Sequence, residues 1–107
     1  MEKRKHLRVA MKNLWVDLSD GVEKFRGIVS DISRLGMRIS GLPKSVNTET
    51  TKLKIVVAGK EGYISMLVGS RWQMDGEGKK AIGVEITNAP LRWTEFVMGF
   101  EDTLKTV

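Results

Sequence analysis

The sequence predicts a mostly β fold, a six-stranded antiparallel β-barrel that is followed by one C-terminal α-helix. Three observations carry this prediction. Apolar and polar residues alternate over several short stretches, which is typical of strands that are buried on one side. Turns that contain glycine separate these stretches, and the chain has 11 glycines in total. After Pro90 the apolar residues take a helical spacing instead.

The first two predicted strands lie in the N-terminal third of the chain. Residues 7–18 form one long stretch that is rich in β-forming residues, and an Asp-Gly turn follows it. Residues 22–32 form the second strand, whose two faces differ. One face is expected to carry Phe25, Gly27, Val29 and Asp31. Ile32 belongs to the opposite face.

Four further strands complete the predicted sheet. They are expected over residues 35–40, 52–55, 63–72 and 80–87, with a polar loop at 44–50. In the fifth strand, one face is expected to carry Ile64, Met66, Val68 and Trp72. A barrel would remove the sheet edges that so small a sheet can hardly protect, and an open sandwich is the alternative.

The C-terminal helix is predicted over residues 90–105. Its apolar stripe consists of Trp93, Phe96, Val97, Phe100 and Leu104. The stripe fits a lid that packs its aromatic side across one opening or flank of the barrel. A helix that faces a partner or dimerises is the alternative, because exposed aromatic stripes favour burial.

The length of 107 residues corresponds to one small domain. We divide it into a basic arm at residues 1–12, a barrel at 13–88 and the helix at 90–105. The chain has no cysteine and one histidine, so disulfides and thiolate or multi-histidine metal sites are excluded, and no cofactor is expected. No apolar run is long enough to span a membrane, so we expect a cytoplasmic protein without membrane insertion.

The residues give no support for catalysis. The single histidine, His6, lies in the basic arm, which is a poor place for a fixed general base. No phosphate-binding loop motif occurs. The remaining candidate carboxylates fit strand ends and turns, namely Asp17, Asp20, Asp75 and Glu77. We therefore expect a protein that is not an enzyme.

Positive charge is concentrated at the N-terminus. The net charge is +5, and residues 1–12 carry five basic residues against one acidic residue. A basic arm on a nearly neutral body indicates an anionic partner, such as a phosphate ligand, a nucleic acid or an acidic membrane. The alternative is a solvated terminus that only aids solubility.

A first short motif within the basic arm indicates which kind of anion the arm binds. It pairs Arg4 with Arg8, and Lys3 precedes them. An arginine fork binds a phosphate or the O6/N7 edge of guanine in bidentate fashion, and its flat face stacks on a base. The arm therefore suits an anionic nucleotide, although two arginines four positions apart are common in a basic chain.

The second motif is Asp31-x-Ser33-x-x-Gly36, at the junction of two predicted strands. A carboxylate accepts hydrogen bonds from the N1–H and N2–H₂ groups of guanine, a serine hydroxyl adds a donor or acceptor, and glycine permits close backbone approach. Together the two motifs would bind both ends of a guanine nucleotide. In the alternative, Asp31 and Ser33 only satisfy backbone groups in a turn.

In this order the two motifs resemble the signature of PilZ domains, bacterial receptors for the second messenger cyclic di-GMP. The family pattern is Arg-Arg-x-x-x-Arg, followed roughly twenty to thirty residues later by Asp or Asn-x-Ser-x-x-Gly. Here Arg8 precedes Asp31 by 23 positions, and a Gly-Val strand at residues 81–86 resembles the family's closing strand. Lys3 stands where the first arginine is usual, which keeps the charge but loses the fork. In the family, a basic residue just before the arginine pair goes with binding of an intercalated ligand dimer.

The resemblance implies a six-stranded barrel that holds the ligand on its outer surface, where the arginine arm wraps a cyclic dinucleotide. Arg4 and Arg8 would contact phosphate and a guanine edge or face. Asp31 and Ser33 would hold the Watson–Crick side of a guanine, while Gly36 shapes the turn.

The expected function is therefore a non-catalytic cyclic di-GMP receptor, in which binding orders the arm and changes the surface offered to an unidentified effector protein. Two alternatives stay open. One is a PilZ-like interaction domain that no longer binds nucleotide. The other is a small barrel that binds RNA or single-stranded DNA through its arm and further cations, namely Arg34, Arg38, Lys52 and Lys54. Nucleic acid is the less expected partner, because no strand interleaves aromatic and basic residues. We expect a monomer or a weak dimer.

Overall fold

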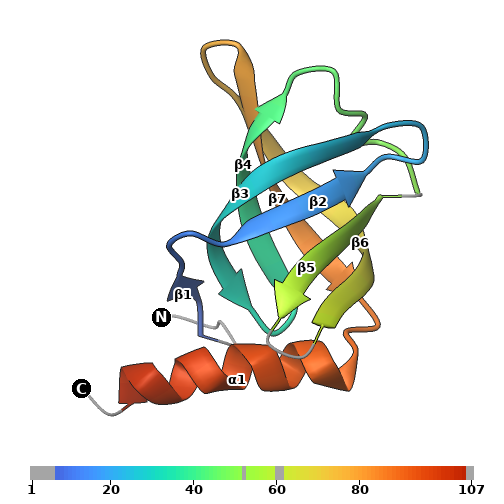
Figure 1. Cartoon of the computed structure of the whole chain (residues 1–107). Coiled ribbons are helices and arrows are strands. Elements are labelled where there is room, and N and C mark those ends of the chain that lie inside the picture. The colour runs from blue at the N-terminus through green and yellow to red at the C-terminus, as the bar shows by residue number, and fades with distance from the viewer. Residues whose placement is uncertain (1–6, 52, 60–61, 106–107) are drawn as a thin grey trace.

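The computed structural model describes residues 7–51, 53–59 and 62–105 (Figure 1). Lys3 and Arg4 lie outside the described residues. The elements are, in chain order, β1 (Val9–Ala10), β2 (Trp15–Ser19), β3 (Lys24–Ser33), β4 (Gly36–Pro43), β5 (Lys54–Gly59), β6 (Gly62–Asp75), β7 (Lys79–Thr87) and α1 (Leu91–Lys105).

Six of the strands close into an antiparallel barrel. Their order is β3-β2-β5-β6-β7-β4, and the pairing of β4 with β3 completes the ring. The short strand β1 is added to β3 as a seventh strand. The predicted six-stranded antiparallel barrel with a C-terminal helix is confirmed. Figure 1 shows α1 across one end of the barrel, while the hairpin of β6 and β7 extends beyond the other end.

The core of the barrel is aliphatic and receives side chains from every strand of the ring. Representative buried residues, one from each strand, are Leu18, Val29, Ile39, Ile55, Met66 and Ile82. From α1, Trp93 and Val97 are fully buried and belong to the same core. Trp93 also stacks on Phe96, with ring centroids 5.5 Å apart. Trp93 and Val97 of the apolar stripe therefore cover one end of the barrel, as the lid interpretation expects, while Phe100 is 36% exposed.

The prediction of one continuous strand over residues 7–18 is wrong. The chain leaves the sheet between β1 and β2, where Asn13 has a left-handed backbone with a φ of 60°. From Ala10 to Trp15 the chain advances five positions, while the paired residues of β3 advance by three. The two extra residues form a bend, which a run of β-forming residues does not reveal.

A β-bulge in β3 reverses the predicted faces of its last residues. The register against β4 shifts between Val29 and Asp31, so that Ser30 is the extra residue. Ile32 is consequently fully buried, and Asp31 points out of the barrel, opposite to the predicted alternation over residues 22–32. The bulge thus brings the Asp31 carboxylate to the outer surface.

A second register shift, between Ser70 and Trp72 of β6, moves an aromatic side chain outward. The alternation in the sequence places Trp72 on the face of Ile64, Met66 and Val68, which are buried. For Trp72 this prediction is wrong, because its side chain is 38% exposed and meets an exposed arginine of β4. The sequence alternation fails where an extra residue interrupts the pairing.

Candidate functional site

The strand pairing places four residues in one row across the outer surface of the barrel. Asp31 on β3 pairs with Arg38 on β4. Arg38 pairs in turn with Gly83 on β7, and Gly83 with Trp72 on β6. Directly opposed residues on neighbouring strands have Cβ atoms about 4.5–5.5 Å apart and interact. We call these four residues the outer row.

Arg8 joins the outer row at its Asp31 end. Strand β1 brings it there, because Val9 is buried in the core and pairs with Ile32. Nη2 of Arg8 lies 2.5 Å from Oδ1 of Asp31, and Nε of Arg38 lies 3.5 Å from Oδ2. Both carboxylate oxygens therefore face a guanidinium group. The Arg8 and Asp31 side chains are only 29% and 16% exposed, so water screens their attraction less than in an open surface pair.

At the other end of the outer row, Arg38 and Trp72 form a flat ledge. Cζ of Arg38 lies 5.4 Å from the centroid of the Trp72 ring, within the range of a cation–π interaction. The indole lies directly over Gly83, where an added Cβ would collide with the ring. Glycine at this position therefore lets the ring lie flat on the sheet. A partly exposed aromatic plane beside a guanidinium is a surface on which a planar base can stack.

Ser33 and Gly36 face the hairpin turn and the neighbouring strand. Ser33 is buried, and its hydroxyl donates to the carbonyl oxygen of Gly36 over 3.5 Å. A Cβ at Gly36 would lie 2.6 Å from the carbonyl oxygen of Val84 on β7. Gly36 is thus required for the close approach of β4 and β7, which the sequence interpretation of a turn-shaping glycine did not include.

The turn that carries the second motif is fastened to α1. Nε1 of Trp93 donates to the carbonyl oxygens of Ser33 and Arg34, at 3.2 and 3.1 Å. Nε and Nη2 of Arg34 donate to the carboxylate oxygens of the buried Glu101, at 3.1 and 2.8 Å. These hydrogen bonds raise the pKa of Arg34 above its ordinary value. The turn between β3 and β4 is therefore fixed by hydrogen bonds to the helix that covers the end of the barrel.

The structure brings one residue of each predicted motif into contact with the other motif. Arg8 and Asp31 form the ion pair, while Ser33 and Gly36 lie in the same hairpin without facing it. The two N-terminal members of the set lie outside the described residues. Within the described part of the chain, no group of three or more His, Asp or Glu side chains could hold a metal ion. No helix in that part is long and apolar enough to cross a membrane.

Sequence reasoning missed the ledge. It considered Arg38 only as part of a nucleic-acid patch and placed Trp72 on the strand face of Ile64, Met66 and Val68. Arg38 could have been found, because a two-residue turn between Ser33 and Gly36 places it opposite Asp31. The position of Trp72 depends on the register shift in β6, which has no signal in the sequence.

No protein-family model matches the chain, and no curated protein sequence matches it. Solved structures do share its fold, among them the following three. The inhibitor of motility MotI/DgrA from Bacillus subtilis has 14% sequence identity and a TM-score of 0.79, over 99% of this chain and 53% of that one. YcgR from Escherichia coli in complex with c-di-GMP has 12% identity and a TM-score of 0.73, over 98% and 47%. The PilZ domain of YcgR with c-di-GMP has 14% identity and a TM-score of 0.63, over 98% and 96%. The chain thus spans about half the length of the first two structures.

Proposed function

The chain has the fold of PilZ domains, and on this basis we propose that it is a non-catalytic receptor for cyclic di-GMP. The observation that carries the proposal is the ion pair of Arg8 with Asp31 on the outer wall of the barrel. This pair joins the two motifs of the sequence, and it does so beside the ledge of Arg38 and Trp72.

The ion pair gives Asp31 a partner that a guanine can replace. The N1–H and N2–H₂ groups of guanine present two parallel donors, as the guanidinium of Arg8 does, and a carboxylate accepts either. When guanine takes the carboxylate, Arg8 is released toward a phosphate of the ligand. One charge-assisted hydrogen bond then replaces another, so the exchange itself changes the free energy little.

The affinity must therefore come from the phosphates and from stacking. The two phosphates would meet Arg8 together with Arg4 and Lys3 of the arm, and Lys3 makes an intercalated ligand dimer possible. A guanine on the ledge of Arg38 and Trp72 would gain about 1–3 kcal/mol from stacking. The contact of Arg38 with the ring already orders this ledge, so stacking costs little side-chain entropy. We expect a dissociation constant in the micromolar range or below, which rises with salt.

Binding would also change what the domain offers to other proteins. Contacts between the basic arm and two phosphates would neutralise part of the positive charge of the domain. We propose that an effector protein distinguishes these two states of the surface.

Titration calorimetry with cyclic di-GMP, GTP and a short single-stranded oligonucleotide tests the receptor function. Heat should appear with cyclic di-GMP, with a stoichiometry that separates one ligand from an intercalated dimer. Arg8→Ala should lower the affinity by about tenfold to a hundredfold, because it removes a charged hydrogen bond worth about 1.5–3 kcal/mol. It should barely change the melting temperature, because Arg38 still faces Asp31.

The structure offers a matched control for this substitution. Arg26 forms an ion pair with Asp17 over 3.2 Å on the same barrel, away from the outer row. Arg26→Ala should bind cyclic di-GMP like the unmodified protein. No heat with tens of micromolar cyclic di-GMP would contradict the proposal and favour a domain that no longer binds nucleotide. Binding of the oligonucleotide alone would favour the nucleic-acid alternative.

A further inference from the structure

An exposed apolar row crosses the outer side of four strands, away from the ion pair of Arg8. Trp15 on β2 pairs with Ile28 on β3, and their side chains are 51% and 40% exposed. Tyr63 on β6 is 72% exposed and pairs with the exposed Ala58 on β5. The pairing of β2 with β5 places Trp15 beside Ala58, because Val16 pairs with Val57 and the strands are antiparallel. These four residues form one continuous row rather than scattered single exposures.

The apolar row has no part in the core of the domain. Val16 and Val57, its neighbours along the strands, point inward and are almost completely buried. Two large aromatic side chains thus remain in water on a part of the wall that the described elements leave open. Burial of such large aromatic side chains by a partner contributes strongly to the free energy of binding.

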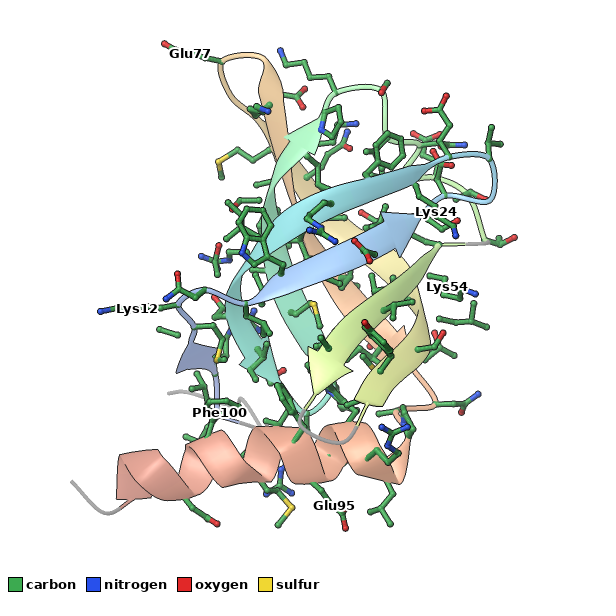
Figure 2. The ribbon with its side chains drawn as sticks, in the orientation of Figure 1. Lys12, Lys24, Lys54, Glu77, Glu95 and Phe100 are labelled. Carbon is green, nitrogen blue, oxygen red and sulfur yellow. The ribbon has the colours of Figure 1, made fainter. Side chains whose placement is uncertain are left out.

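A basic row runs parallel to the apolar row, toward the other end of the same strands. Lys24 on β3 and Lys54 on β5 both pair with Ser19 on β2, which lies between them. Figure 2 shows both lysines on the same side of the barrel. Arg26 and Asp17 lie between the two rows and pair with each other. The basic row therefore adds the charges of Lys24 and Lys54 to a strand surface on which Arg26 and Asp17 neutralise each other.

We propose that the apolar row and the basic row together, here called the lateral face, dock an acidic protein segment that carries a bulky apolar side chain. The apolar side chain covers Trp15 and Tyr63, and the carboxylates of the segment meet Lys24 and Lys54. Charge complementarity selects the acidic partner and speeds its approach.

The arrangement of the two rows favours an acidic protein segment over the two other anionic partners, nucleic acid and an acidic lipid surface. Nucleic-acid binding on a β-surface needs aromatic and basic residues interleaved along the path of the strand, whereas here they form two separate rows. Insertion into a lipid surface needs side chains that project from the body, whereas Trp15 and Tyr63 lie on the wall of the sheet.

The size of the lateral face indicates a weak and reversible complex. Four strands spaced about 4.8 Å apart, over five residues that rise about 3.3 Å each, give a face of roughly 15 by 17 Å. This is a fraction of the roughly 800 Å² that each partner buries in a standard interface. We therefore expect a dissociation constant of about ten to a few hundred micromolar.

The lateral face adjoins the proposed ligand site through the chain itself. Trp15 begins β2 directly after the bend that leads from β1, where Arg8 is held, and the bend is tied to β3 by a hydrogen bond from the backbone N–H of Val29 to the carbonyl oxygen of Leu14. Release of Arg8 from Asp31 by the ligand would act on the edge of the lateral face and so could alter the docking of the acidic segment. This coupling between ligand and docking rests on the proposed function.

Selection from a random peptide library displayed on phage tests the docking proposal. The library is selected on the unmodified protein and depleted on Trp15→Ser/Tyr63→Ser. The surviving peptides should be acidic and contain a bulky apolar residue. Synthetic copies should lose about tenfold or more in affinity for this variant and for Lys24→Glu/Lys54→Glu. A matched control is Leu91→Ser/Met98→Ser, which removes two exposed apolar side chains from α1 and should leave the affinity unchanged.

Several results would overturn the docking proposal. The first are selected peptides that are not acidic, or peptides that bind the variants as tightly as the unmodified protein. The second is sedimentation of the protein with phosphatidylcholine vesicles containing phosphatidylserine, if it depends on Trp15. The third is a dimer in sedimentation equilibrium that depends on Trp15. Calorimetry on the same variants separates this proposal from the receptor function. Cyclic di-GMP should bind both lateral-face variants as it binds the unmodified protein. If it binds none of them while acidic peptides are still selected, the receptor function fails and the docking proposal stands.

Discussion

Replacing Gly36 by alanine should open the seam between β4 and β7. A Cβ at this position would lie 2.6 Å from the carbonyl oxygen of Val84, which belongs to the backbone and has no rotamer to move to. The neighbouring bond from the N–H of Ile86 to the carbonyl oxygen of Leu35, at 2.8 Å, would be strained by the same movement. Overpacking of this kind costs about 1–3 kcal/mol. For a small domain, each kcal/mol lowers the melting temperature by about 4–8 °C, so we expect a fall of roughly 5–20 °C.

Thermal unfolding followed by circular dichroism measures this effect, and Gly69→Ala is its matched control. Gly69 also lies in a barrel strand, but nothing stands within 4 Å of an added Cβ there. The control should melt at the same temperature or slightly higher, because alanine loses less backbone entropy on folding than glycine does.

The same pair of variants assigns a role to the motif glycine. If Gly36→Ala has the same melting temperature as the unmodified protein but no longer binds cyclic di-GMP, the glycine is needed for contact with the ligand. The argument from barrel closure is then refuted. If its melting temperature falls while the protein that remains folded still binds cyclic di-GMP, the glycine is needed to seat β4 against β7.

Three further outcomes follow from the contacts described above. Trp72→Leu should weaken cyclic di-GMP binding by about 1–3 kcal/mol in calorimetry, through lost stacking; an unchanged affinity would remove the ledge from the site. Trp93→Phe should lower the free energy of unfolding in urea by about 1–3 kcal/mol, because the carbonyl groups of the motif turn lose their donor; equal urea midpoints would show that the indole bonds do not hold the turn. Backbone N–H groups of Glu23, Val22 and Asn47 lower the pKa of Asp20, so its contribution to stability is complete above the ordinary carboxyl pKa and disappears as the pH falls through the lowered one. Asp20→Asn should therefore be less stable than the unmodified protein at pH 7, and the difference in unfolding free energy should shrink as the pH falls below the ordinary carboxyl pKa; a difference in stability that does not narrow in acid would contradict this origin.

The barrel itself could be predicted because its signals are local. Alternation of apolar and polar residues marked strands such as the one with Met37 and Ile39 inward, glycine turns separated them, and the stripe through Trp93 and Val97 marked the helix. The two motifs were also found without structure, because each is a short run of residues whose chemistry suits one ligand. What the alternation could not foresee were the register shifts.

Those shifts decide the geometry of the candidate site. One extra residue at Ser30 turns Asp31 outward and Ile32 inward, and one near Arg71 turns Trp72 outward. Each bulge lies in the pairing with the next strand along the chain, and the alternation of residues within one strand does not mark it. The motif at Asp31 was thus identified with an incorrect strand face for its first residue.

The attachment of the motif turn to α1 has a consequence for how the molecule is made. Trp93 and Glu101 hold a turn that was synthesised some sixty residues earlier, across sequence separations of 59 and 67. Contacts of such long range form late in folding, and the helix is the last of the described elements to leave the ribosome. A nascent chain could therefore close most of its barrel and still lack a fixed turn, so that the proposed binding site would be complete only after the final helix has formed.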